Sequence, residues 1–197
     1  MDVPEVRRAR AQGARGRRRV VAVIGSGTAV DPACAGLGRL VAAMGFDLLT
    51  GGGRGTMEEV SRAFFETAPR KGIVIGVIPG EVERMNALER RIGSAINFEL
   101  RPGYPNPWVE LAIYTHLPDS GPEGTLRSSR NHINVLSADA IVAMPGGEGT
   151  IAEVWLATQY GVPIVAFGDH REGTPSGIPL ARSLDDVRYF LSSSCKR

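Results

Sequence analysis

Short runs of apolar, mostly β-branched residues alternate with segments of helical length from residue 20 onward. The runs that we expect to form strands are Val20–Ile24, Phe46–Leu49, Ile73–Ile78, Ala140–Met144 and Pro163–Phe167. Continuous apolar runs of this length are typical of strands buried on both faces, as in parallel sheets. The pattern therefore predicts a doubly wound α/β domain, in which helices cover both faces of a mainly parallel sheet.

Segments of helical length separate these runs and predict the covering helices. They span Pro32–Met44, Met57–Ala68, Ser129–Leu136, Ile151–Tyr160 and Leu184–Leu191. The first is the best delimited, because Asp31 can cap it, Pro32 suits its first position and Gly45 can end it. Strand and helix thus alternate along most of the chain, as the crossover connections of a parallel sheet require.

Two stretches depart from this alternation. Residues 1–19 hold seven arginines against two acidic residues, so they carry +5, whereas the whole chain carries +2. They lack aromatic residues that could stack on bases, so we predict a disordered tail and no nucleic-acid partner. Residues 20–197 then form a single domain. Within it, prolines interrupt residues 79–128, which we predict to be a loop-rich insertion, either a binding loop or a disordered excursion.

Composition narrows the class of protein further. The longest apolar runs fall well short of the ~20 residues that span a bilayer, and no apolar signal core follows the N-terminus. Cys34 and Cys195 lie far apart, without a CxxC pair or a nearby histidine. We therefore expect a cytoplasmic protein with no membrane partner, no metal site and no resident cofactor.

Three glycine-rich turns follow predicted strands, at Gly25–Gly27, Gly51–Thr56 and Pro145–Thr150. Glycine lets the backbone approach a ligand closely, and the free amides at the start of the following helix attract an anion. In open α/β sheets such turns gather beyond the carboxyl ends of the strands. We predict that the second and third turns bind the phosphate of a nucleotide-like molecule, through Gly52, Gly53, Gly55, Thr56, Gly146, Gly147, Gly149 and Thr150.

These turns match neither a P-loop, since no Gly-Lys-Ser/Thr triplet occurs, nor a dinucleotide fingerprint, since GxGxxG is absent after the first strand. A nicotinamide cofactor is therefore disfavoured. Thr150 and Glu153 stand three residues apart near a helix start, which places them on one helical face. Spacing alone leaves two interpretations open: Thr150 contacts a phosphate and Glu153 the adjoining sugar, or the two form a capping box.

Residues 145–153 read PGGEGTIAE, and this run resembles the PGGxGTxxE signature of the Lonely Guy family. These nucleoside 5′-monophosphate phosphoribohydrolases belong to the SLOG-type Rossmann-like superfamily. Arg130 precedes Asp139 by nine residues, the spacing of that family's catalytic arginine. The resemblance implies a homodimer, paired through helices such as Ile151–Tyr160, that releases a free base from a nucleotide such as a cytokinin-type N6-substituted adenosine monophosphate.

The same resemblance implies roles for two residues. Glu153 would stabilise an oxocarbenium-like state and manage a proton, as carboxylates do in glycoside hydrolysis. Arg130 would hold the phosphate or ribose end, or assist departure of the base. Both are expected to be catalytic.

Another part of the sequence is similar to a different branch of the superfamily. The run RNHINVLS, which begins at Arg130, is closer to the molybdenum-cofactor carrier proteins, which share the fold and bind a phosphorylated pterin. Asn131 stands where the hydrolases usually have lysine, and Glu58 replaces one of their glycines. The sequence favours a phosphoribohydrolase, and its alternative is a non-catalytic carrier of a phosphorylated ligand such as molybdenum cofactor or a nucleotide.

Overall fold

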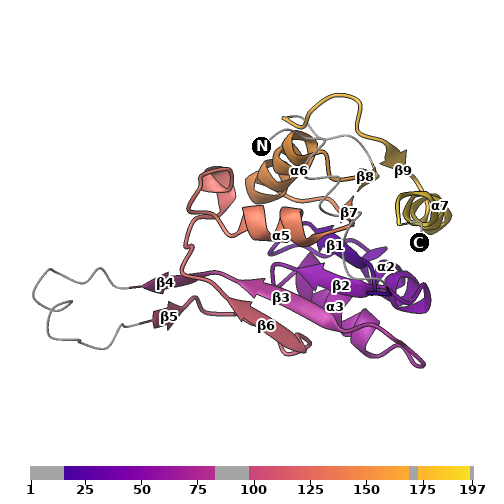
Figure 1. The fold of residues 1–197 in the computed structure, drawn as a ribbon, viewed down its shortest axis with the longest axis horizontal. Coiled ribbons are helices and arrows are strands. Elements are labelled where there is room, and N and C mark those ends of the chain that lie inside the picture. The colour runs from indigo at the N-terminus through magenta and orange to yellow at the C-terminus, as the bar shows by residue number, and fades with distance from the viewer. Residues whose placement is uncertain (1–15, 83–97, 169–172, 196–197) are drawn as a thin grey trace, which may run out of the picture.

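A seven-stranded parallel sheet forms the centre of the computed structural model, which describes residues 16–82, 98–168 and 173–195. The strands run in the order β6-β3-β2-β1-β7-β8-β9 (Figure 1). Their bounds are β1 (Val20–Ile24), β2 (Asp47–Thr50), β3 (Val74–Ile78), β6 (Leu111–Tyr114), β7 (Ala140–Ala143), β8 (Ile164–Phe167) and β9 (Leu180–Ala181). Because β1 lies between β2 and β7, the winding direction changes between β1 and β7, where ligands of such sheets bind.

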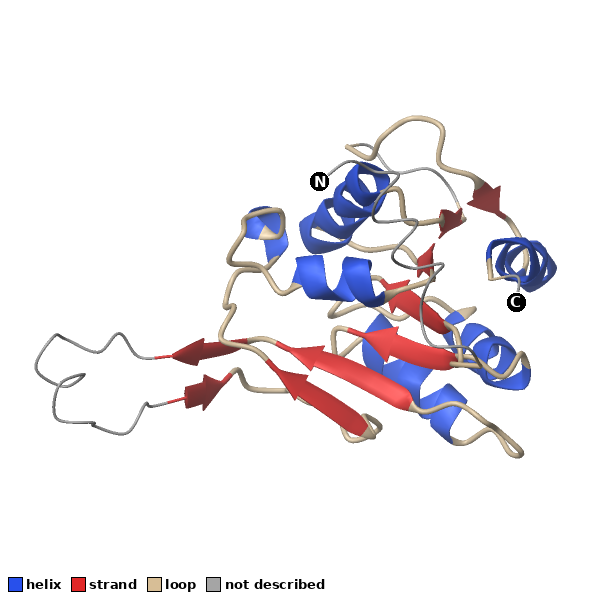
Figure 2. Cartoon of the chain, viewed as in Figure 1, coloured by secondary structure: helices blue, strands red, loops and turns tan. Residues whose placement is uncertain are grey.

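Helices cover both faces of the sheet, which confirms the predicted doubly wound α/β fold (Figure 2). They are α2 (Cys34–Ala43), α3 (Thr56–Phe65), α5 (Asn131–Ser137), α6 (Glu148–Tyr160) and α7 (Leu184–Ser194). Leu37 of α2, Phe64 of α3 and Leu191 of α7 share one buried cluster with the strands. Val135 of α5 and Leu156 of α6 belong to a second cluster. No helix in the described ranges is long and apolar enough to cross a membrane.

Helix α6 begins three residues earlier than the sequence predicts. It starts at Glu148 rather than Ile151, and Gly147 is its N-cap. Thr150 therefore lies inside the helix and does not cap it. The capping-box interpretation of Thr150 and Glu153 is therefore wrong.

The start of α2 also differs from the prediction. It begins at Cys34 rather than Pro32, and Asp31 instead accepts a hydrogen bond of 2.8 Å from the N–H of Ala33. The predicted end is confirmed, because Gly45 follows the helix with a φ of 77°. At such an angle glycine is favoured over residues with a Cβ.

The predicted insertion contains regular structure, including the edge strand of the main sheet. β6 pairs in parallel with β3, with Leu111 opposite Ile75. Its four residues, Leu-Ala-Ile-Tyr, are mostly exposed although they form a short apolar run, because β6 lies at the edge of the sheet. β4 (Gly80–Val82) and β5 (Phe98–Leu100) form an antiparallel pair that extends away from the sheet (Figure 1). Residues 83–97 lie outside the described part of the chain.

The domain begins before residue 20, where the sequence predicts a disordered tail. Arg17 donates two hydrogen bonds, of 2.6 and 2.7 Å, to the carboxylate of Asp139, and Arg18 pairs with Asp47 at 2.8 Å. Burial raises the pKa of Asp139, but hydrogen bonds from Arg17 and the Val20 N–H outweigh that effect and hold the pKa below its usual value. Residues 17–19 are therefore attached to the sheet, while residues 1–15 lie outside the described ranges.

Candidate functional site

The three glycine-rich turns meet at the carboxyl ends of β1, β2 and β7. The Ser26 N–H donates to the Pro145 carbonyl at 3.1 Å, which joins the first turn to the third. The Thr56 N–H donates to the Ser26 carbonyl at 2.9 Å, which joins the second turn to the first. The turns thus converge as predicted, at the position where the winding direction of the sheet changes.

A pocket of about 310 Å³ opens between these turns and the start of α6. This volume lies within the roughly 300–1,000 Å³ that small-molecule sites occupy. Five of the residues that the sequence singles out line it: Arg130, Gly147, Gly149, Thr150 and Glu153.

Other residues predicted to bind phosphate do not line this pocket, namely Gly52, Gly53, Gly55, Thr56 and Gly146. They shape the turns instead. A Cβ on Gly55 would lie 2.5 Å from the Ser26 carbonyl oxygen, so only glycine fits there. The hydroxyl of Thr56 donates to the Ala29 carbonyl at 3.3 Å and so holds the loop after β1.

Arg130 is the N-cap residue of α5 and is 6% exposed. Its Nε and Nη1 are buried, and no acceptor among the described residues pairs with either atom. The guanidinium lies against the backbone of Gly51, closer than it could approach a residue with a Cβ. A buried cation without a partner is costly, so this arrangement favours an anion in the adjacent pocket.

Glu153 lies in the second turn of α6 and is 8% exposed. Asn134 of α5 donates to its Oε1 at 3.0 Å. Burial raises the pKa of the Glu153 carboxyl, and the positive charge of Arg130 and the Asn134 hydrogen bond oppose that rise. The pocket therefore places a carboxyl of raised pKa near a guanidinium whose Nε and Nη1 have no hydrogen-bond partner among the described residues.

The start of α6 adds backbone donors to the pocket. No side chain caps this 13-residue helix, and its N-cap Gly147 and the first-turn residue Gly149 line the pocket. The first amides of a helix have no partner within the helix and lie at the positive end of its dipole. Arg130, these amides and the Thr150 hydroxyl can together bind a phosphate group.

Sequence patterns do not reveal the wall that faces α6. Tyr104 and the segment Ser120–Gly121 line the pocket from the predicted insertion. His132 ties this wall to α5 and α6, because its Nε2 lies 3.0 Å from the Leu126 carbonyl oxygen and its Nδ1 lies 2.7 Å from the Tyr160 hydroxyl. No local motif marks these contacts, since each joins segments that are distant or irregular in the sequence.

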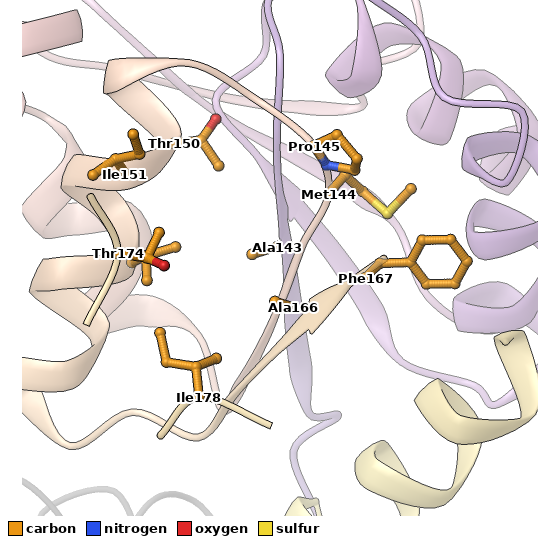
Figure 3. Close-up of a pocket in the computed structure, with 10 residues that line it drawn as sticks. Ala143, Met144, Pro145, Thr150, Ile151, Ala166, Phe167, Thr174 and Ile178 are labelled. Atoms are coloured by element: carbon orange, nitrogen blue, oxygen red, sulfur yellow. The ribbon is translucent and has the colours of Figure 1, made fainter. Parts of the chain in front are cut away.

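A second cavity lies on the other side of Thr150, between α6 and the ends of β7 and β8 (Figure 3). Apolar side chains such as Met144, Phe167 and Ile178 form most of its wall. Its volume of about 30 Å³ holds no more than one or two water molecules. This cavity is therefore too small for a nucleotide-like molecule, whereas the glycine-lined pocket is about ten times larger.

An all-parallel, doubly wound sheet with its pocket at the point of reversal is the architecture of the Rossmann-like class. Residues 18–180 match the model of the SLOG cluster4 family, so the chain belongs to this family. A search of curated proteins finds no significant match.

Solved structures extend the comparison. The molybdenum cofactor binding protein from Rippkaea orientalis is 25% identical, with a TM-score of 0.63 over 92% of this chain and 99% of its own. The molybdenum cofactor carrier protein from Chlamydomonas reinhardtii is 23% identical, with a TM-score of 0.64 over 92% and 100%. DNA processing protein A from Helicobacter pylori, described with single-stranded DNA, is 13% identical, with a TM-score of 0.51 over 89% and 80%. The fold thus serves different ligands, and function must be argued from the site.

Proposed function

We propose that this protein binds a phosphorylated small molecule in the glycine-lined pocket and acts as a carrier or binding protein for it. The observation that carries the proposal is the buried guanidinium of Arg130, which lies at the pocket without a hydrogen-bond acceptor on Nε or Nη1 among the described residues. A phosphate supplies several acceptor oxygens and negative charge in one group. It would therefore satisfy the guanidinium and the first amides of α6 together.

Molybdenum cofactor, a phosphorylated pterin, is the ligand that the comparisons favour. The structure that is 25% identical is described as a molybdenum cofactor binding protein, and the match covers nearly the whole of both chains. Asn131 and Asn134, which belong to the part of the sequence that resembles the carriers, lie in or beside the pocket. This combination supports carriage of an intact ligand over its hydrolysis.

Isothermal titration calorimetry of the full chain tests the proposal. The probes are adenosine 5′-monophosphate, ribose 5-phosphate and a phosphorylated pterin. Arg130→Met should weaken binding of the preferred probe by at least about 100-fold, because two charge-assisted hydrogen bonds of ~1.5 kcal/mol each would be lost. Arg39→Met, at an exposed position on α2, is the matched control and should bind like the parent. Equal affinity of the Arg130 variant would contradict the proposed site.

A nucleoside 5′-monophosphate phosphoribohydrolase is the second candidate, because the pocket also contains Glu153. Its carboxyl is buried, has a raised pKa and lies near Arg130. In this reaction the bond between the base and C1′ of the ribose breaks, water oxygen bonds to C1′, and a proton passes to the base. Glu153 would stabilise the developing cation and handle the proton of the water.

Chromatography for free base separates the two candidates. A hydrolase should release base from a monophosphate, including N6-substituted adenosine monophosphates, but not from the matched nucleoside, and Glu153→Gln should bind the nucleotide without turnover. A carrier should release base from neither. Release by the Glu153→Gln variant at the parental rate would exclude a catalytic role for this carboxyl.

The homodimer remains a prediction, and the structure changes which residues of α6 can support it. Trp155, which would otherwise be expected in the core, is 42% exposed. Leu156 is buried within the chain, and Tyr160 bonds to His132. Light scattering at micromolar concentration should give twice the 21.0 kDa mass of the chain. A mass of one chain would contradict the prediction.

A further inference from the structure

Tyr104 brings an aromatic ring to the pocket from the segment between β5 and β6. It lines the same pocket as Arg130 and Glu153. Its ring rests directly on the second glycine-rich turn, because a Cβ on Gly53 would lie 2.9 Å from Cε1, Cζ and the hydroxyl oxygen. Gly53 thus contributes by admitting this ring, which the glycine pattern does not reveal.

Hydrogen bonds hold the segment of Tyr104 against that turn. The side-chain amide of Asn106, which is 3% exposed, donates to the Gly53 carbonyl at 2.9 Å. The Asn106 N–H donates to the Gly52 carbonyl at 2.8 Å, and its Oδ1 accepts from the Trp108 N–H at 3.1 Å. Tyr104, two residues before Asn106, is therefore attached to the rigid part of the site. A ring fixed in this way loses little conformational entropy when a ligand binds.

The environment of Tyr104 differs from that of a tyrosine that only packs a loop onto the domain. The residue is half-buried, and it lines the pocket on the side of the second glycine-rich turn. Met57 lines the same pocket and offers a polarizable thioether, which makes favourable contacts with aromatic rings.

We infer that Tyr104 is the surface on which a flat heteroaromatic ring of the ligand stacks, while the phosphate binds at Arg130 and the start of α6. This inference rests on the proposed function and adds the residue that holds the ring of a ligand in which a phosphate is joined through a short linker to a planar ring. A purine nucleotide and a phosphorylated pterin share this chemistry. Stacking on an aromatic side chain tolerates either ring, because both present a π-face.

Calorimetry with Tyr104→Leu tests the inference, using the full chain and three probes. Adenosine 5′-monophosphate and neopterin monophosphate carry a ring, and ribose 5-phosphate carries none. Tyr104→Leu should lose about 5- to 150-fold in affinity for the ring-bearing probes, the range that base stacking on aromatic side chains supplies. Its affinity for ribose 5-phosphate should stay within about twofold of the parent.

Further variants separate stacking from a structural role. Tyr104→Phe keeps the ring and should retain the preference for ring-bearing probes. Gly53→Ala places a methyl group where the Tyr104 ring now lies, so it should displace the ring and show the same selective loss. This variant provides the test if Tyr104→Leu does not fold. Tyr189→Leu, at a position on α7 that is 79% exposed, is the matched control and should behave like the parent.

The outcomes distinguish this inference from the proposed function. An equal loss for all three probes would show that Tyr104 only shapes the pocket and would overturn the inference. So would a parent protein that binds ribose 5-phosphate as tightly as both ring-bearing probes. A parent that binds none of the probes would overturn the proposed function and this inference with it. The ring-bearing probe that the parent binds more tightly shows whether the site prefers a purine or a pterin ring.

Discussion

The guanidinium of Arg130 lies where a Cβ would stand on any residue other than glycine at position 51. These two residues are far apart in the sequence, yet they are in contact at a guanidinium whose Nε and Nη1 have no hydrogen-bond partner among the described residues. Gly51 is buried and its φ is not in the left-handed region. Space for Arg130, rather than backbone conformation, is therefore the reason for glycine at this position.

Gly51→Ala should weaken phosphate binding far more than it weakens folding. The added methyl group must displace the end of a flexible arginine side chain, which is a small cost in stability. Ligand affinity should nevertheless fall by about tenfold or more, because losing even one charge-assisted hydrogen bond costs ~1.5–3 kcal/mol. Calorimetry and thermal denaturation on the same sample measure both effects. A large fall in melting temperature with unchanged affinity would contradict this role of Gly51.

Arg130→Met should leave the unliganded protein as stable as the parent, or more stable. The side chain is buried without acceptors on Nε and Nη1, and replacing such a charge by an apolar group of similar length is often neutral or stabilising by ~1–4 kcal/mol. Urea denaturation without ligand measures the difference, with Arg39→Met as the surface control. Marked destabilisation would mean that the charge of Arg130 supports the fold.

Glu153 should make the unliganded protein less stable as the pH rises. Its folded pKa is raised above the ordinary value of 4.5 by burial, so the folded state binds more protons than the unfolded state between the two values. The associated stability is present below pH 4.5 and is lost as the pH rises through the folded pKa. Glu153→Gln should flatten this part of the stability curve. Identical pH dependence in both proteins would show that the carboxyl is not shifted.

The attachment of residues 17–19 should contribute measurable stability. A chain that begins at Arg19 lacks the Arg17–Asp139 pair and should lose on the order of 1–3 kcal/mol at neutral pH, because the Asp139 side chain is mostly buried. A chain that begins at Gly16 should keep the parental stability. Because the folded pKa of Asp139 lies below 3.8, the difference should be present above that pH and lost as the pH falls through the folded pKa.

Urea denaturation of the two shortened chains, at neutral pH and near pH 3, measures how much the attachment of residues 17–19 stabilises the domain. Asp139→Asn in the full chain is a second route to the same loss. Equal stability of both shortened chains at neutral pH would restore the prediction that the whole arginine-rich segment lies outside the working domain.

The sequence by itself determined the class of fold and the alternation of β1, β2, β3, β7 and β8 with the covering helices. Apolar runs mark strands buried on both faces, because burial depends on the side chains of the run itself. The sequence also predicted the turn before α6 and the role of Glu153 as one motif, since its glycines and Glu153 lie within one short segment. The edge strand β6 was not predicted, because its four apolar residues follow a proline-rich stretch and lie within the predicted loop-rich insertion.

Only the tertiary structure decided how the site is assembled. It placed Arg130 against Gly51, Tyr104 on Gly53 and Asn134 on Glu153, and it attached Arg17 to Asp139. It also showed that Gly52, Gly53, Gly55 and Gly146 shape the turns without lining the pocket. The physical reason is that each of these contacts depends on the path of the backbone between distant segments, whereas sequence patterns report only what neighbouring side chains require of their own segment.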